Sequence, residues 1–259
     1  MNPGPSAVPS LYRNGLIIRY GNFAFRRRNY LFPVVFLILC AVFTPTFPAG
    51  SESLDHWLDL GVIALAVWGE GIRVATVGLE YIKRGGVDKR VFADKLVTTG
   101  MFAHCRNPLY VGNILMFGGL LVIVDRWPVY VLGGAFIVMT YIALVAAEEH
   151  FLAQKFGAAY EDYCARVNRW RPRLSGLTKT FQSTRFNWRR VLVKEYSSVY
   201  SWIVTALALE LMETLVERGW GADQSWILTL LGVLWLGATL TMLVVWAFKK
   251  RGSLKQSTG

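Results

Sequence analysis

Long apolar runs constrain this chain more than any other feature. There are six. Three are uncharged and of full length, at 30–50, 127–147 and 226–248. A fourth, at 108–124, is shorter, and two contain charged residues, at 57–81 and 196–216. Crossing a bilayer takes roughly 20 helical residues, and lipid leaves the backbone no other hydrogen-bond partners. We therefore predict an all-α, polytopic integral membrane protein with about six transmembrane helices.

The positive charges lie in blocks beside these runs rather than along one face. The net charge is +11, and the blocks are residues 26–28, 83–90, 166–173, 185–194 and 249–251. Basic residues gather in cytoplasmic loops of membrane proteins. This pattern predicts cytoplasmic N- and C-termini and explains the charge without nucleic acid as a partner.

The chain divides into four segments. We expect a cytosolic N-terminal arm at 1–29, whose Pro- and Ser-rich first 14 residues favour disorder, and a first span with its outer loop at 30–56. A membrane core follows at 57–173, and a basic linker with two further spans at 174–259. The three cysteines have no metal-like spacing, and we expect neither disulfides nor a metal site.

The spans at 108–124 and 127–147 are separated by so few residues that they must form a tight antiparallel hairpin. The start of the first therefore lies beside the end of the second. Apolar residues then recur at helical spacing among charges over 148–169, which predicts a cytosolic amphipathic helix after span four.

Charged residues meet at the cytosolic mouth of this hairpin. Asn107 suits a helix cap and Pro108 a first helical position, so the positive end of the helix dipole faces the cytosol beside Arg106. Glu148 and Glu149 arrive on the same side. Such a place can hold a zwitterion, although ordinary interfacial charges at two helix ends would look the same.

Two linked motifs occupy this mouth: Gly100-x-Phe102-x-x-x-Arg106-Asn107-Pro108-x-Tyr110-x-Gly112, then Glu148-Glu149-x-x-Leu152-x-x-x-Phe156-Gly157-x-x-Tyr160-x-x-Tyr163 with Arg169-x-x-Pro172. They resemble the superfamily of isoprenylcysteine carboxyl methyltransferases and phospholipid methyltransferases over residues 57–173. The resemblance implies methyl transfer from S-adenosylmethionine, on the cytosolic side, to a lipid-like substrate admitted from the bilayer.

The resemblance also implies roles for individual residues. Glu149 would bind the amino group of the cofactor, with Glu148 as its neighbour, and Arg169 would orient a substrate head group or anchor a lipid phosphate. The expected cofactor-binding residues are Arg106, Asn107, Pro108, Tyr110 and Gly112, with His104 as a polar neighbour or a base. The acceptor can be a carboxylate, which needs no base, or an amine, for which a glutamate or His104 would be the base.

Three further interpretations stay open. Glu70 and Arg73 lie three residues apart inside a span, which favours an internal ion pair, although Arg73 could border the pocket. A sterol-reductase-like oxidoreductase that uses NADPH would share a similar helix arrangement. A third possibility is a non-catalytic membrane scaffold that keeps the pocket without turnover.

Overall fold

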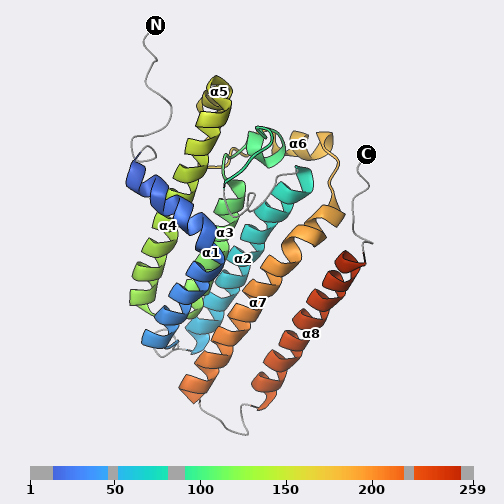
Figure 1. The fold of residues 1–259 in the computed structure, drawn as a ribbon. Helices are drawn as coiled ribbons and strands as arrows, with labels where there is room; N and C mark the ends of the chain where they lie inside the picture. Colours follow the sequence, from blue (N-terminus) through green and yellow to red (C-terminus); the bar gives the residue numbers. More distant parts are fainter. Residues whose placement is uncertain (1–13, 46–51, 81–90, 219–224, 252–259) are drawn as a thin grey trace.

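A computed structural model describes residues 14–45, 52–80, 91–218 and 225–251 (Figure 1). The described residues are helical, without strands, as predicted. The helices are α1 (Gly15–Val42), α2 (Glu52–Leu79), the short 3-10 helix η3 (Gly100–Ala103), α3 (Pro108–Ile123), α4 (Trp127–Phe156), α5 (Ala158–Arg166), α6 (Leu177–Ser183), α7 (Trp188–Arg218) and α8 (Ser225–Lys250).

The long helices form one elongated bundle, with α5, α6 and η3 at its upper end in Figure 1. Four helical segments among the described residues are long and apolar enough to cross a membrane: Trp57–Leu79, Trp127–Phe156, Trp188–Val216 and Ser225–Lys250. The apolar helix Pro108–Ile123 is shorter. The protein is thus an integral membrane protein, while six spans and the orientation stay predictions.

Helix α1 begins earlier than expected. Asn14 caps it, its side chain accepting a hydrogen bond from the backbone N–H of Leu16 at 2.9 Å. Residues 15–29, which we assigned to an arm, are therefore helical, because a cap at Asn14 starts a helix that the basic block at 26–28 does not interrupt. The expected disorder of residues 1–14 and the basic block at 83–90 lie almost wholly outside the described residues.

The predicted hairpin of α3 and α4 is confirmed, with a turn centred on Asp125. Asp125 has φ +45°, a conformation that aspartate tolerates better than most residues. Its carboxylate accepts a hydrogen bond from the Tyr130 hydroxyl at 2.6 Å. The turn brings the N-terminus of α3 and the C-terminal part of α4 to the same end of the bundle.

The amphipathic segment after span four differs from the expectation of one helix over 148–169. Helix α4 continues unbroken through both glutamates to Phe156. Gly157 then adopts φ +50°, which ends α4, and the short helix α5 follows. A residue with positive φ cannot continue a right-handed helix, and glycine adopts that conformation at little cost.

The two C-terminal long helices extend the bundle sideways. Helix α7 packs on α2 and α3, and the Trp202 indole N–H donates to the Met116 carbonyl at 2.8 Å. Helix α8 lies along α7, and none of its described residues is buried. In Figure 1 α8 therefore stands at the edge of the bundle, whereas α7 borders the core.

Candidate functional site

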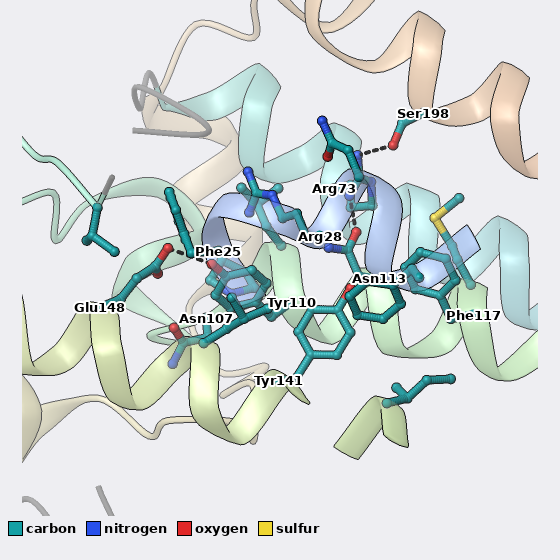
Figure 2. Close-up of a pocket in the computed structure, with 18 of the residues that line it drawn as sticks. Phe25, Arg28, Arg73, Asn107, Tyr110, Asn113, Phe117, Tyr141, Glu148 and Ser198 are labelled. Carbon is teal, nitrogen blue, oxygen red and sulfur yellow. Dashed lines mark hydrogen bonds between the residues drawn. The ribbon is translucent and has the colours of Figure 1, made fainter. Parts of the chain in front are cut away.

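A cavity of about 880 Å³ lies inside the bundle. It is bordered by α1, α3, α4 and α7, by Arg73 of α2 and by the segment 91–97. The end near α5 is lined by polar side chains, some of which Figure 2 shows. The opposite end is lined by apolar side chains such as Leu39, Leu121 and Ile137. Its size suits a ligand of cofactor size with room for part of a second molecule.

Glu149 is clamped by two arginines at the polar end. Arg169 donates to both carboxylate oxygens, from Nε at 2.8 Å and from Nη2 at 2.7 Å. Arg106 donates from Nη1 to the Glu149 carboxylate at 3.1 Å and to the Cys164 sulfur at 2.9 Å. Only 3% of the Glu149 side chain is exposed, so this carboxylate is committed to fixing the two guanidinium groups.

The N-terminus of α3 faces the same end of the cavity. Asn107 occupies the capping position, as predicted, but its side chain makes no cap hydrogen bond and donates instead to the Arg169 carbonyl at 3.2 Å. Pro108 is the first helical residue. Arg106 Nε is buried without a hydrogen-bond partner among the described residues. The unpaired Nε donor of Arg106 therefore lies beside the positive end of a helix dipole.

Glu148 has a different environment from Glu149. It accepts a hydrogen bond from the Tyr110 hydroxyl at 2.5 Å, and both residues line the cavity (Figure 2). Arg28 of α1 also lines the cavity, with its guanidinium 4.7 Å from the centre of the Phe25 ring. We expected Glu149 as the partner of a bound cation, but this geometry favours Glu148, because both oxygens of Glu149 already accept from arginines.

A second buried arginine lies on another wall. Arg73, 3% exposed, donates to Glu70 at 3.2 Å and to the Ser198 hydroxyl at 2.9 Å. It also contacts the side chains of Asn113 and Glu195. The expected pair of Glu70 and Arg73 is confirmed, and Arg73 also borders the cavity. The partner Glu195, in α7, was not predicted.

Three of the predicted site residues do not line the cavity. The ring nitrogens of His104 contact the Arg173 carbonyl at 2.7 Å and the Thr180 hydroxyl at 2.8 Å, so this side chain holds the linker that contains α6. Arg169 contacts Glu149, which does line the cavity. Gly112 faces α2, where a Cβ atom would lie 2.5 Å from the Gly69 carbonyl oxygen.

The cysteines near the site are neither paired nor ionised at neutral pH. Cys105 and Cys164 are free and buried. Burial raises the pKa of the Cys105 thiol to about 11 and also raises the pKa of the Cys164 thiol, despite the nearby Arg106. A neutral thiol is a poor nucleophile and a poor metal ligand. Both cysteines therefore act here as packing residues and weak hydrogen-bond groups.

Comparison with known proteins identifies the family. Residues 61–159 match the family model for phospholipid methyltransferase. The chain belongs to the superfamily of integral membrane methyltransferases. The matched segment contains Arg73, Arg106 and both glutamates of the cavity, but it ends before Arg169 and before α7. Residues 61–159 therefore carry the family match, and helices α1, α7 and α8 lie outside it.

Two curated relatives bear names that refer to metal resistance. The nickel-cobalt-cadmium resistance protein NccN of Alcaligenes xylosoxydans xylosoxydans is 28% identical over 55% of this chain and 62% of its own length. The cobalt-zinc-cadmium resistance protein CzcN of Cupriavidus metallidurans is 31% identical over 66% of this chain and 75% of its own length. The match thus spans less than two thirds of the first relative. No solved structure matches significantly.

The cavity itself has no features of a metal centre. Among the residues that the structure describes, no group of three or more histidine, cysteine, aspartate or glutamate side chains could hold a metal ion. Glu149 and Glu148, which line its polar end, accept hydrogen bonds from arginine and from tyrosine respectively. Side chains of both charge signs, Arg106 and Glu148 among them, line this end of the cavity.

Proposed function

We propose that this protein transfers a methyl group from S-adenosylmethionine to an amphiphilic acceptor within the membrane. The observation that carries the proposal is the charge arrangement at the polar end of the cavity. Arginine-clamped Glu149, the α3 N-terminus and the separate carboxylate of Glu148 converge there. Family membership supports methyl transfer in general, and this end of the cavity supports the cofactor.

The clamp around Glu149 carries surplus positive charge. Two guanidinium groups and one carboxylate give a formal charge of +1, taking both arginines as protonated. Arg106 Nε, buried without a partner among the described residues, is a donor available to an anion. The methionine carboxylate of the cofactor would complete this group, and a buried donor left unpaired would otherwise cost stability.

Glu148 would hold the positive part of the cofactor. The Tyr110 hydroxyl fixes one of its oxygens at 2.5 Å and thereby orients the carboxylate. S-adenosylmethionine bound here would supply an electrophilic methyl group on a sulfonium. Tyr110 and Glu148 would align this charge, and the surrounding apolar helices would keep water away from the reacting atoms.

The apolar end of the cavity would hold the acceptor. Phe32, Leu39, Leu121 and Ile137 line it, from α1, α3 and α4. An aliphatic tail buried there would place its polar head toward Glu148. A carboxylate acceptor would react directly, whereas for an amine Glu148 is the carboxylate positioned to take a proton. We propose that this polar end faces the cytosol, as the basic flanks of the helices indicate.

Titration of the purified full-length chain in detergent with S-adenosylmethionine, S-adenosylhomocysteine and NADPH tests the proposal. Arg106→Lys keeps the charge but removes the Nε donor, and Glu148→Gln removes the anion. Each should weaken binding of S-adenosylmethionine by about tenfold or more, as the loss of one charge-assisted hydrogen bond implies. Tyr200→Phe is the control, because Tyr200 contacts Thr239 of α8 outside the cavity.

The three ligands separate the competing functions. Binding of S-adenosylmethionine and S-adenosylhomocysteine, weakened in both variants and not in the control, would support the methyltransferase. Binding of NADPH alone would replace it with a reductase, and binding of no ligand would favour a scaffold.

A further inference from the structure

Helix α7 lies outside the segment that matches the family, yet it forms a wall of the cavity. Six of its residues line the cavity: Lys194, Ser197, Ser198, Ser201, Trp202 and Thr205. All of these except Trp202 carry a hydroxyl or an ammonium group. Side chains that face lipid in a membrane helix are normally apolar, so a polar stripe on a span marks a functional face.

The stripe follows one face of the helix. Ser197, Ser201 and Thr205 are spaced four residues apart, which places them one above another. At 1.5 Å per residue this row extends about 12 Å along the helix. Ser197 and Ser201 are exposed on the surface of the protein and also line the cavity, so they lie at its mouth.

The charged groups beside this row are largely engaged with one another. Ser198 accepts from Arg73, whose other partners are Glu70, Asn113 and Glu195. Because Arg73 is held by two carboxylates, it presents no surplus positive charge to the cavity. The groups that α7 offers along the row are hydroxyls: those of the serines can donate or accept, whereas the Thr205 hydroxyl donates to the Ser201 carbonyl and can accept from a ligand.

The α7 wall is also held rigidly against the core. The buried Glu195 contacts Arg73 of α2, and Trp202 donates to the Met116 carbonyl of α3. The row of hydroxyls is thus fixed relative to the Tyr110 and Glu148 end of the cavity. Fixed groups discriminate between ligands better than mobile ones.

We propose that α7 is the wall of the cavity that recognises the methyl acceptor, an inference that rests on the proposed function. Ser197, Ser201 and Thr205 hydrogen-bond the polar head of an amphiphile that enters between α7 and α1. Its apolar tail lies against the aromatic side chains Phe32 and Phe36 of α1 and Phe117 of α3, which line the cavity opposite. Helix α7 thereby determines which acceptor is methylated, while the matched core binds the cofactor.

Two measurements on the full-length chain in lipid vesicles separate acceptor recognition from cofactor binding. The first is transfer of tritiated methyl from S-adenosylmethionine to a total lipid extract of the expression host. The second is the Kd for S-adenosylmethionine. The double variant Ser201→Ala and Thr205→Val should raise the half-saturating lipid concentration by about tenfold, as loss of one or two hydrogen bonds implies, with the Kd unchanged. The double variant Ser201→Ala and Thr205→Ser, which keeps one hydroxyl, should raise the half-saturating lipid concentration less.

Thr241→Val in α8 is the matched control. Its hydroxyl donates to the backbone carbonyl four residues earlier at 2.8 Å, as the Thr205 hydroxyl does at 2.7 Å, but Thr241 does not line the cavity. An unchanged half-saturating concentration in the double variant would overturn the proposal. So would a native chain that binds S-adenosylmethionine and methylates no lipid in the extract. A native chain that does not bind S-adenosylmethionine would refute the proposed function instead.

Discussion

The two buried arginine clusters of this protein have opposite compositions. The cluster at the polar end combines Arg106 and Arg169 with Glu149, which gives a formal charge of +1. The cluster between α2 and α7 combines Arg73 with Glu70 and Glu195, which gives −1. Both border one cavity. The first has a donor to spare at Arg106 Nε, whereas all three guanidinium nitrogens of Arg73 donate to protein groups.

This difference separates a ligand site from a structural connection. A cluster with surplus charge and an unpaired donor gains stability when a ligand of opposite charge arrives. A cluster whose central arginine is surrounded by protein partners fixes helices and has no donor left for an anion. We therefore propose that the first cluster binds the cofactor and that the second positions α7.

The largest effect should come from Glu149→Gln. The substitution leaves Arg106 and Arg169 buried beside each other without a carboxylate, and breaking a buried ion pair costs about 3–5 kcal/mol. Thermal unfolding of the full chain in detergent should show a large loss of stability. Glu161→Gln on the exposed face of α5 serves as the control. A native-like melting curve for Glu149→Gln would mean that the clamp does not carry the charge balance described here.

A smaller effect should follow Glu195→Gln. Arg73 keeps Glu70, Asn113 and Ser198 as partners, so the expected loss is about 1–3 kcal/mol. Binding of S-adenosylmethionine should be unchanged, because the two clusters do not share a residue. Equal losses of cofactor affinity in Glu195→Gln and Glu149→Gln would erase the distinction between site and connection.

The smallest effect concerns Cys105, which lies beside the first cluster. Burial raises its pKa from 9.0 to about 11 in the folded chain. Between these pH values the unfolded thiol loses its proton while the folded thiol keeps it, so this residue makes folding less favourable as pH rises through that window. Iodoacetamide should therefore leave Cys105 unmodified in the folded protein at pH 7 and modify it after unfolding. Rapid modification of the folded chain would show that the thiol is accessible and ionised.

The helices and one part of the site could be predicted from the sequence. Apolar runs indicated membrane helices, and the few residues between α3 and α4 were enough to bring Arg106 and the paired glutamates to one end. Both inferences depend on local spacing, which a sequence displays directly. The close contact of Arg106 with Glu149 at 3.1 Å agrees with that geometry, while the roles of these residues stay predictions.

The remaining contacts depend on packing between segments far apart in the chain. No periodic pattern of residues in the sequence predicts such contacts. Arg169 reaches Glu149 only because Gly157 ends α4 and α5 turns the chain back. Glu195 meets Arg73 across more than a hundred residues. The positive φ of Gly157 had a visible signal, since a glycine interrupts the amphipathic segment there. For Glu195 the only signal was a carboxylate near the start of a span.

The glycine contact between α2 and α3 bears on how the cavity can open. A Cβ atom on Gly112 would lie 2.5 Å from the Gly69 carbonyl oxygen, and one on Gly69 would lie 2.6 Å from the Gly112 carbonyl oxygen. Backbones in such contact cannot slide past each other without a clash, so these two helices move as a single rigid body. Helix α7 is tied to this body through Glu195–Arg73 and Trp202–Met116, so gating of the cavity to the bilayer falls to displacements of α1, which borders it opposite α7.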